Sequence, residues 1–278
     1  MALKVDGETS LFITIGDPVA QTKSPALLSE ILAQRGVNAV VVPAHVGAAD
    51  LSAFMASVRL MKNLLGIVVT VPHKHAALAY CDTLTERATM IGAVNVIHRT
   101  SGGRWHGDNL DGVGFVQGLA KEDFDFRRKT ALLVGAGGAG SAIGFELLAE
   151  GVGTLAVYDV NRARQDLLVE KLERKFGKRA TCGRPEPEGY DLVVNATPLG
   201  MNATDPTPLK LSGLSKSSFV ADIITKPMVS PMVEYARRLE CRTMIGVTMF
   251  EAQAQRLADT LESAARCRTS GGEGKPGC

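Results

Sequence analysis

Strand-like apolar runs alternate along the chain with stretches whose apolar residues recur at helical spacing. Residues 11–15 form the first run, a helix-like stretch begins at Pro25, and residues 39–42 form the next run. A second helix-like stretch, 51–58, leads to the run 64–71. This alternation is typical of β-α-β units and predicts an α/β fold with a parallel sheet.

The alternation resumes after the charged residues 121–129, which mark the passage into a second domain. It predicts a doubly wound sheet there, with a last amphipathic helix near the end of the chain. The further predicted strands are 93–97, 103–106, 131–134, 155–158, 192–194 and 219–224, and the further predicted helices begin near Ser141, cover 168–176 and cover 254–261.

One of these runs, 131–134, leads into a glycine-rich loop that opens a helix. The first glycine permits a tight turn, the second lets backbone N–H groups approach a pyrophosphate, and the last lets the helix lie close to the strand. The next strand, 155–158, ends at an acid roughly 20 residues further on, the spacing at which a carboxylate meets the ribose hydroxyls. The predicted dinucleotide-binding residues are Gly135, Ala136, Gly137, Gly138, Ala139, Gly140 and Asp159.

Asp159 also bears on the choice of cofactor. A carboxylate at this strand end repels a 2′-phosphate and accepts hydrogen bonds from free ribose hydroxyls, which favours NAD. Arg162 and Arg164 follow closely, so NADP stays possible. Either arginine could turn toward a phosphate, or both could form the charged face of the next helix.

Composition and charge narrow the partners. Hydrophobic residues make up 45% and charged residues 22%, and the net charge is +2, so we expect a small-molecule substrate and neither nucleic acid nor a membrane as partner. No segment approaches roughly 18 unbroken apolar residues, and the first residues lack the apolar core of a signal peptide, which favours the cytoplasm.

The cysteines and histidines predict no metal site. The five cysteines are scattered without CxxC spacing, so we expect reduced thiols and neither a disulfide framework nor a zinc site. His73 and His75 alternate around a lysine, but no cluster of Cys, Asp or Glu completes a ligand set.

Six blocks, in order along nearly the whole chain, resemble those of the shikimate dehydrogenase family. They resemble its N-terminal substrate motif, its catalytic-lysine segment, two further active-site blocks, its cofactor-domain loop and its C-terminal return to the substrate domain. In that order the blocks are 16–25, 69–74, 92–95, 107–112, 195–201 and 246–253.

The resemblance implies a two-domain α/β enzyme with its active site in the cleft between the domains. We expect an N-terminal αβ substrate-binding and catalytic domain at 1–111 and a doubly wound Rossmann cofactor domain at 112–239. A C-terminal helical segment, 240–266, returns to the first domain. The tail 267–278 is rich in glycine and polar residues and is predicted to be disordered.

Moving a hydride from a secondary alcohol to a nicotinamide requires a group that takes the hydroxyl proton. The resemblance assigns that role to Lys74, with Asp111 as its partner and as a ligand of a ring hydroxyl. Thr22 and Ser24 match positions that hold the substrate carboxylate, although Ser24 also suits the N-cap of the helix from Pro25. Thr70, Asn95 and Gln253 match positions that contact ring hydroxyls in the family. Further positions that contact the cofactor are matched by Arg164, Thr197, Pro198, Leu199, Ile223, Gly246 and Met249.

Four positions depart from the family pattern, and each departure removes a polar contact or alters one. Thr22 stands for a usual serine, Val68 for asparagine, Leu110 for threonine and Thr225 for a tyrosine that touches substrate. Since a site built to bind a hydroxyl discriminates by large factors, we expect the pocket to favour a less hydroxylated, altered or bulkier relative of shikimate. Quinate and an aminoshikimate stay open.

The sequence therefore predicts an NAD(P)-dependent alcohol dehydrogenase of the type that converts shikimate to 3-dehydroshikimate in aromatic amino acid biosynthesis, acting as a monomer or homodimer. One alternative is a dehydrogenase of a different hydroxy acid. Another is a non-catalytic protein that senses NAD or a metabolite, and the joint presence of Lys74, Asp111, Asn95 and Gln253 counts against it.

Overall fold

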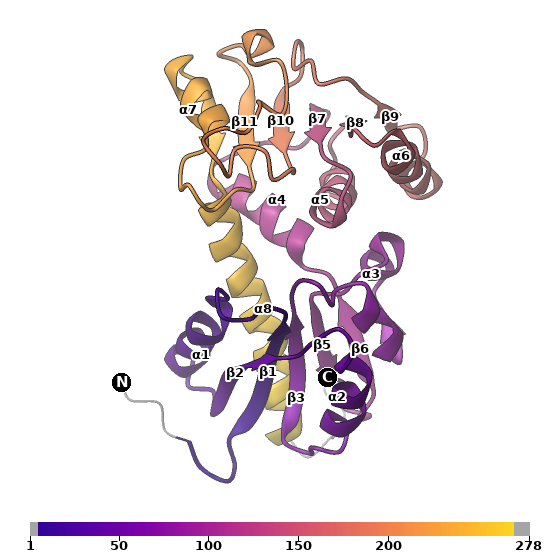
Figure 1. The fold of residues 1–278 in the computed structure, drawn as a ribbon, viewed down its shortest axis with the longest axis vertical. Helices are drawn as coiled ribbons and strands as arrows, with labels where there is room; N and C mark the ends of the chain where they lie inside the picture. The colour runs from indigo at the N-terminus through magenta and orange to yellow at the C-terminus, as the bar shows by residue number, and fades with distance from the viewer. Residues whose placement is uncertain (1–4, 270–278) are drawn as a thin grey trace. The chain divides into compact units, whose positions relative to one another are not determined.

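The computed structural model describes residues 5–269, and within this range the chain forms two compact units, each built on its own six-stranded sheet (Figure 1). Unit 1 contains the residues up to Leu110 and those from Ala254 onward, and unit 2 is Asp111–Gln253. The predicted α/β fold class is confirmed. None of the described helices is long and apolar enough to cross a membrane.

The sheet of unit 1 has the strand order β2-β1-β3-β5-β6-β4. Strand β1 pairs in parallel with β2 and β3, whereas β5 is antiparallel to both β3 and β6. The sheet is therefore mixed, where the sequence predicted a parallel one. The turn between β5 and β6 is too short for the crossover connection that a parallel pair needs, so these two strands are antiparallel. The elements are β1 (Ser10–Gly16), α1 (Ser24–Gln34), β2 (Ala39–His45), α2 (Leu51–Val58), β3 (Leu64–Val69), the 3-10 helix η1 (Ala76–Tyr80), β4 (Thr83–Leu84), α3 (Glu86–Ile91), β5 (Val96–Arg99) and β6 (Trp105–Asp108).

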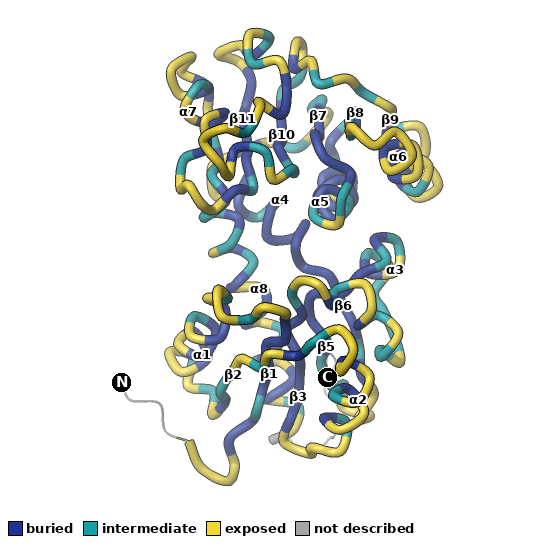
Figure 2. The backbone as a smooth tube through the Cα atoms, in the orientation of Figure 1, coloured by how far each residue is buried: buried dark blue, intermediate teal, exposed yellow. Residues whose placement is uncertain are grey.

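The core of unit 1 follows from the alternation along its strands. Ile13 and Ile15 share one face of the sheet with Ile67, and Met55 of α2 packs against them. Phe12, which alternates with Ile13, faces the other side of the sheet, and it is fully buried as well. Strand β3 is buried at every residue and β1 at every residue except Leu11, and both strands are largely dark blue in Figure 2.

Helix α8 (Gly246–Thr269) contributes its residues from Ala254 onward to unit 1. An ion-pair cluster ties this part to the end of α1. The Arg35 guanidinium lies 2.8 Å from a carboxylate oxygen of Asp259 and 3.0 Å from one of Glu262.

Unit 2 has the strand order β12-β11-β10-β7-β8-β9, with every pair parallel. Figure 1 shows β11, β10, β7, β8 and β9 in that sequence, with α7 beside β11 and α6 near β9. The elements are α4 (Asp111–Lys121), β7 (Thr130–Val134), α5 (Gly138–Ala149), β8 (Thr154–Tyr158), α6 (Arg162–Phe176), β9 (Ala180–Cys182), β10 (Leu192–Asn195), the 3-10 helix η2 (Leu211–Gly213), β11 (Phe219–Asp222), α7 (Pro231–Arg238), β12 (Arg242–Met244) and the first residues of α8.

The position of a ligand follows from this order. The chain runs from β7 outward to β8 and β9, and then returns to β10 on the other side of β7. In doubly wound sheets, ligands bind at the carboxyl ends of the strands where the order reverses. In unit 2 that point lies between β7 and β10.

Two local predictions are wrong. Helix α1 includes Ser24, so the N-cap position falls to Lys23, which makes no side-chain capping hydrogen bond, while Pro25 lies in the first turn as expected. Helix α5 begins at Gly138 rather than near Ser141. Asp111, predicted as the partner of Lys74, is the first residue of α4.

The C-terminal part also differs from expectation. Strand β12 adds an edge to the sheet of unit 2, so the residues directly after 239 belong to that unit. Helix α8 continues to Thr269 and includes the first residues of the predicted tail, while residues 270–278 lie outside the described residues. Cys81, Cys182 and Cys241 are free thiols as expected, but Cys267 is disulfide-bonded.

A histidine pair in unit 1 predicts acid sensitivity. His98 of β5 lies opposite His106 of β6, with ring centroids 5.4 Å apart, and burial and the charge of His106 lower the pKa of His98 to about 4. The folded chain therefore binds fewer protons than the unfolded chain between pH 6.5 and about pH 4, and the free energy of unfolding falls as the pH drops through this range. In His98→Phe, urea unfolding should depend less on pH across it, and a variant as pH-sensitive as the wild type would contradict the assignment.

Candidate active site

The glycine loop connects the carboxyl end of β7 to α5. Gly135 has a φ of +106°, and a Cβ at this residue would lie 2.8 Å from the carbonyl oxygen of Ala196. A Cβ on Gly140 would lie 1.9 Å from the carbonyl oxygen of Gly135. At Gly137 and Gly138 a Cβ would meet nothing within 4 Å. The loop therefore packs tightly where it meets the sheet and stays open where the helix N-terminus can receive a phosphate.

Asp159 directly follows β8 and holds this loop. One carboxylate oxygen accepts the Ala136 N–H at 2.7 Å, and the other accepts the Asn161 N–H at 2.8 Å. The Asp159 N–H in turn donates to Oε1 of Gln165, 3.3 Å away. The acid predicted to meet a ribose is thus also a fixed support of the glycine loop.

A cavity of about 300 Å³ opens at the carboxyl ends of β7 and β10, where the strand order of unit 2 reverses. Its walls are largely apolar and contain one acid and one base, which suits a flat aromatic base with an attached ribose. Seven predicted cofactor residues line it: Gly135, Gly137, Asp159, Arg164, Thr197, Pro198 and Leu199.

The two arginines near Asp159 differ in their surroundings. Arg162 pairs with Asp166 one helical turn later, at 3.1 Å. Arg164 lines the cavity and uses its backbone N–H, but no side-chain atom, to bond to Asn161. Arg164 is therefore the basic residue positioned to bind a cofactor phosphate.

Residues 197–199 are held by a side chain that sequence reasoning missed. Asn195, at the end of β10, is fully buried, and its Oδ1 accepts the Thr197 N–H at 3.0 Å and the Thr197 hydroxyl at 2.7 Å. Its Nδ2 donates to the carbonyl oxygen of Leu199 at 3.1 Å. The available signal was its position as the first residue of the block 195–201.

The remaining predicted cofactor residues do not line this cavity. Ala136, Gly138, Ala139 and Gly140 form the rest of the glycine loop and the start of α5. Ile223 and Gly246 lie together, since a Cβ on Gly246 would be 2.4 Å from the Ile223 carbonyl oxygen. Met249 packs near Gly118 of α4 instead.

Within unit 1, the predicted substrate hydroxyls follow β1 and β3. Ser24 is buried, Thr22 and Thr70 are half-buried, and the three hydroxyls make no hydrogen bond to any residue that the structure describes. Thr70 packs so close to Gly16 that a Cβ on Gly16 would lie 2.6 Å from the methyl group of Thr70. These hydroxyls are available to a polar ligand.

Asn95 binds the backbone of Leu110, where the first segment of unit 1 ends. It is 3% exposed, its N–H donates to the Asp108 carbonyl oxygen, and its Oδ1 accepts the Leu110 N–H at 2.9 Å. Asp108 is itself held by Arg87, whose Nε lies 2.8 Å from Oδ1. The amide orientation of Asn95 is thereby set.

Lys74 lies in the turn that follows β3. Its side chain is half-buried, and its carbonyl oxygen accepts the Val94 N–H at 2.9 Å. The flanking histidines have different surroundings: His73 is buried with Nε2 2.7 Å from the Val46 carbonyl oxygen, and His75 is exposed. In the part of the chain that the structure describes, no three His, Cys, Asp or Glu side chains are grouped as metal ligands.

Asp111 and Gln253 meet within unit 2. Gln253 Nε2 donates to Oδ1 of Asp111 at 2.5 Å, and a Cβ on Gly114 would lie 2.5 Å from that of Gln253. The structure therefore brings together two residues that the resemblance assigned to ring hydroxyls. Lys74 belongs to unit 1, and its pairing with Asp111 stays a prediction.

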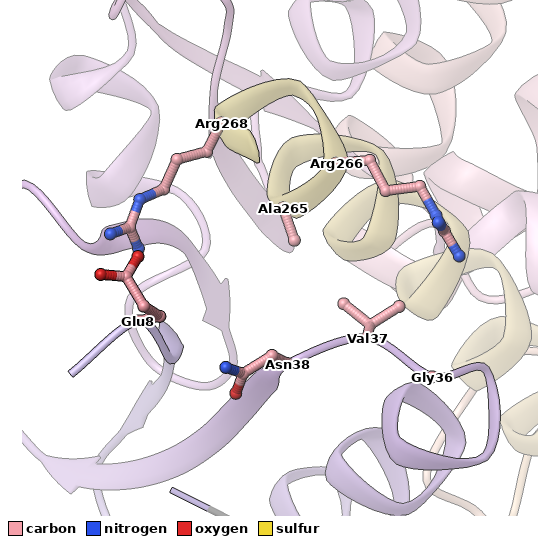
Figure 3. A pocket seen from close by; sticks show the side chains of 7 residues that line it. All are labelled: Glu8, Gly36, Val37, Asn38, Ala265, Arg266 and Arg268. Carbon is pink, nitrogen blue, oxygen red and sulfur yellow. The ribbon is translucent and has the colours of Figure 1, made fainter. Parts of the chain in front are cut away.

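A larger cavity of about 480 Å³ lies in unit 1, at the amino ends of β1 and β2 (Figure 3). Its lining includes Glu8, Asn38, Arg266 and Arg268, and the two arginines extend away from each other. It contains none of the predicted site residues, and it lies at the edge opposite to the carboxyl ends, where ligands of such sheets bind. The candidate site is therefore formed by the predicted residues at the carboxyl ends of the strands and not by this cavity.

Comparison with known proteins shows which family the chain resembles. Residues 14–97 match the family model of the shikimate dehydrogenase substrate binding domain. Shikimate dehydrogenase (NADP(+)) of Rhodospirillum rubrum is 36% identical over 258 residues, covering 90% of this chain and 91% of that protein.

Two solved structures share the fold over their lengths. Shikimate 5-dehydrogenase from Listeria monocytogenes, in complex with shikimate and NAD, has a TM-score of 0.86 at 27% identity and covers 93% of both chains. Quinate dehydrogenase from Corynebacterium glutamicum, in complex with NAD, has a TM-score of 0.82 at 28% identity, covering 94% of this chain and 99% of that one.

The close contact at Gly140 gives a stability test. Gly140→Ala forces α5 away from the Gly135 carbonyl and should lower the free energy of unfolding by about 1–3 kcal/mol. Gly138→Ala is the matched control, because a Cβ there meets nothing within 4 Å, and it should be neutral or stabilising. Urea unfolding without cofactor measures both, and equal stability of the two variants would contradict the packing described.

Proposed function

The chain belongs to the shikimate dehydrogenase family, and we propose that it transfers a hydride between NAD and a shikimate- or quinate-like cyclic hydroxy acid. The observation that carries the proposal is the cavity at the carboxyl ends of β7 and β10, with the glycine loop on one side and Asp159 in its wall. Its donors and walls suit a nicotinamide dinucleotide. When bound, that cofactor supplies the carbon that accepts or returns the hydride.

The chain's own residues handle the proton and the orientation of the substrate. The alcohol carbon loses a hydride and its hydroxyl loses a proton, so a ketone forms, and the amine of Lys74 accepts that proton. Thr22 and Ser24 bind the substrate carboxylate through hydroxyls that have no partner among the described residues. Thr70, Asn95, Asp111 and Gln253 bind ring hydroxyls.

Asp111 is well prepared for this role. It is 7% exposed, and the Gln253 amide fixes its carboxylate at the start of α4. A carboxylate held at a helix N-terminus is stabilised by the helix dipole, and its orientation is set before the substrate arrives.

Asp159 favours NAD over NADP. Its carboxylate is held in the cavity wall by two backbone N–H groups, so it cannot turn away to make room for a 2′-phosphate without giving them up. Arg164 is the opposing influence, because it lines the same cavity.

The substrate is a variant of the shikimate type. Val68 and Leu110 are each 5% exposed and offer apolar groups where the family often has polar ones. Quinate and an aminoshikimate remain within the proposal, as does another hydroxy acid. We place the enzyme in the cytoplasm, as a monomer or homodimer.

Turnover tests the function directly. Purified protein is mixed with shikimate or quinate and NAD, and the absorbance of reduced nicotinamide is followed. Lys74→Ala should lose about 10²–10⁴-fold in kcat, because the proton then has no positioned acceptor. Lys62→Ala, on an exposed turn after α2, is the control and should keep full activity. An undiminished kcat in Lys74→Ala would contradict the role assigned to Lys74. Absence of turnover in the wild-type protein would favour the sensor instead.

Cofactor preference tests Asp159. Asp159→Asn keeps an oxygen for the Ala136 N–H but removes the charge, and it should shift the ratio of kcat/KM toward NADP by about tenfold, or ~1.4 kcal/mol. Adding Arg164→Ala should cancel that gain, whereas adding Arg162→Ala should not, because Arg162 is paired with Asp166. An unchanged ratio in Asp159→Asn would show that the carboxylate does not select the cofactor.

A further inference from the structure

Unit 2 buries a carboxylate that the proposed reaction does not use. Asp222, the last residue of β11, is 1% exposed. Its Oδ2 accepts the Ser230 hydroxyl at 2.6 Å, and its Oδ1 accepts the Ile224 N–H at 3.0 Å. Nδ2 of Asn195 lies 3.2 Å from both oxygens.

The same asparagine holds the wall of the cofactor cavity. While its Nδ2 faces Asp222 and the Leu199 carbonyl, its Oδ1 accepts two hydrogen bonds from Thr197. The Thr197 hydroxyl then accepts the Leu199 N–H at 3.2 Å. Thr197 and Leu199 both line the cavity.

Asn195 has two possible amide orientations, and its neighbours decide between them. An ionised carboxylate only accepts hydrogen bonds, so it requires the NH₂ group of the asparagine on its side. The oxygen then faces the Thr197 N–H, which needs an acceptor. In the flipped orientation the NH₂ group would face that N–H, and the Asn195 oxygen would face the Asp222 carboxylate.

We propose that Asp222 is a positioning residue for the cofactor: it fixes the amide of Asn195, and through it holds residues 197–199 in the shape that receives the dinucleotide. The effect is indirect, because Asp222 itself is not among the residues that line the cavity. The inference rests on the proposed cofactor site and adds a residue to it.

The Asp222 carboxylate also contributes to stability, because it accepts hydrogen bonds from Ser230, Ile224 and Asn195. Burial raises the pKa of Asp222, opposed by hydrogen bonds from Ser230, Ile224 and Asn195. Removal of the carboxylate therefore lowers the free energy of unfolding in either case, and cofactor binding and hydrogen exchange at residues 197–199 are the readouts that separate the two roles. A positioning role and a purely structural role therefore predict different measurements.

The test compares three variants with one control. In Asp222→Ala and in Asn195→Ala, NADH binding measured by nicotinamide fluorescence should weaken about tenfold, or ~1.4 kcal/mol, and KM for NAD should rise to match. KM for the hydroxy acid should change less than about twofold. Asp222→Asn should recover most of the loss, because its amide oxygen can still accept from Asn195.

Asp191→Ala is the matched control. Asp191 accepts hydrogen bonds from the Thr130 N–H and hydroxyl at the amino end of β7, so its loss perturbs the same sheet far from the carboxyl ends. It should lower the urea midpoint and leave NADH binding unchanged. Amide hydrogen exchange at Thr197 and Leu199 should accelerate in Asp222→Ala and not in Asp191→Ala.

The outcomes separate this inference from the proposed function. Wild-type-like NADH binding and exchange in both Asp222→Ala and Asn195→Ala would overturn the positioning role while the cofactor site stands. If Asp222→Ala fails to fold, Asn195→Ala and Asp222→Asn decide by the same readouts. Absence of NADH binding by the wild-type protein would overturn both, and it would locate the error in the proposed cofactor.

Discussion

The close approach of Gly140 to the carbonyl of Gly135 determines how α5 leaves β7. Because a Cβ at Gly140 would fall 1.9 Å from that oxygen, glycine alone lets the helix start directly behind the strand. The helix N-terminus then faces the carboxyl end of the sheet, with open space at Gly137. The Asp159 bond to the Ala136 N–H closes the loop from the neighbouring strand. The cofactor cavity depends on these contacts.

In both units, the polar side chains of the candidate site lie at the ends of strands. In unit 2, Asp159, Asn195 and Asp222 end or follow β8, β10 and β11, and parallel pairing places them along one edge. In unit 1, Thr70 follows β3 and packs on Gly16, the last residue of β1. Strand ends suit such residues because the strands supply a rigid base while the side chains need not enter the apolar core.

Local signals made much of this predictable, and non-local contacts made the rest unpredictable. The glycine spacing and the acid after the next strand located the loop and the wall of the cavity. The two- and three-residue strands β4, β9 and β12 are too short to carry a periodic pattern. Helix α4 contains three glycines in its first eight residues, which lowers its helix propensity, yet Gly112 and Gly114 are required where α5 and Gln253 pack against it. Asn195 and Asp222 are 27 positions apart and meet only because β10 and β11 pair in register.

The most direct measurement follows the hydride itself. Shikimate or quinate deuterated at the carbon whose hydroxyl becomes the ketone is incubated with the protein and NAD, and the reduced cofactor is examined by mass spectrometry. The account predicts reduced cofactor that carries the deuterium. Unlabelled reduced cofactor, or none with either acid, would contradict hydride transfer from a shikimate-type hydroxy acid.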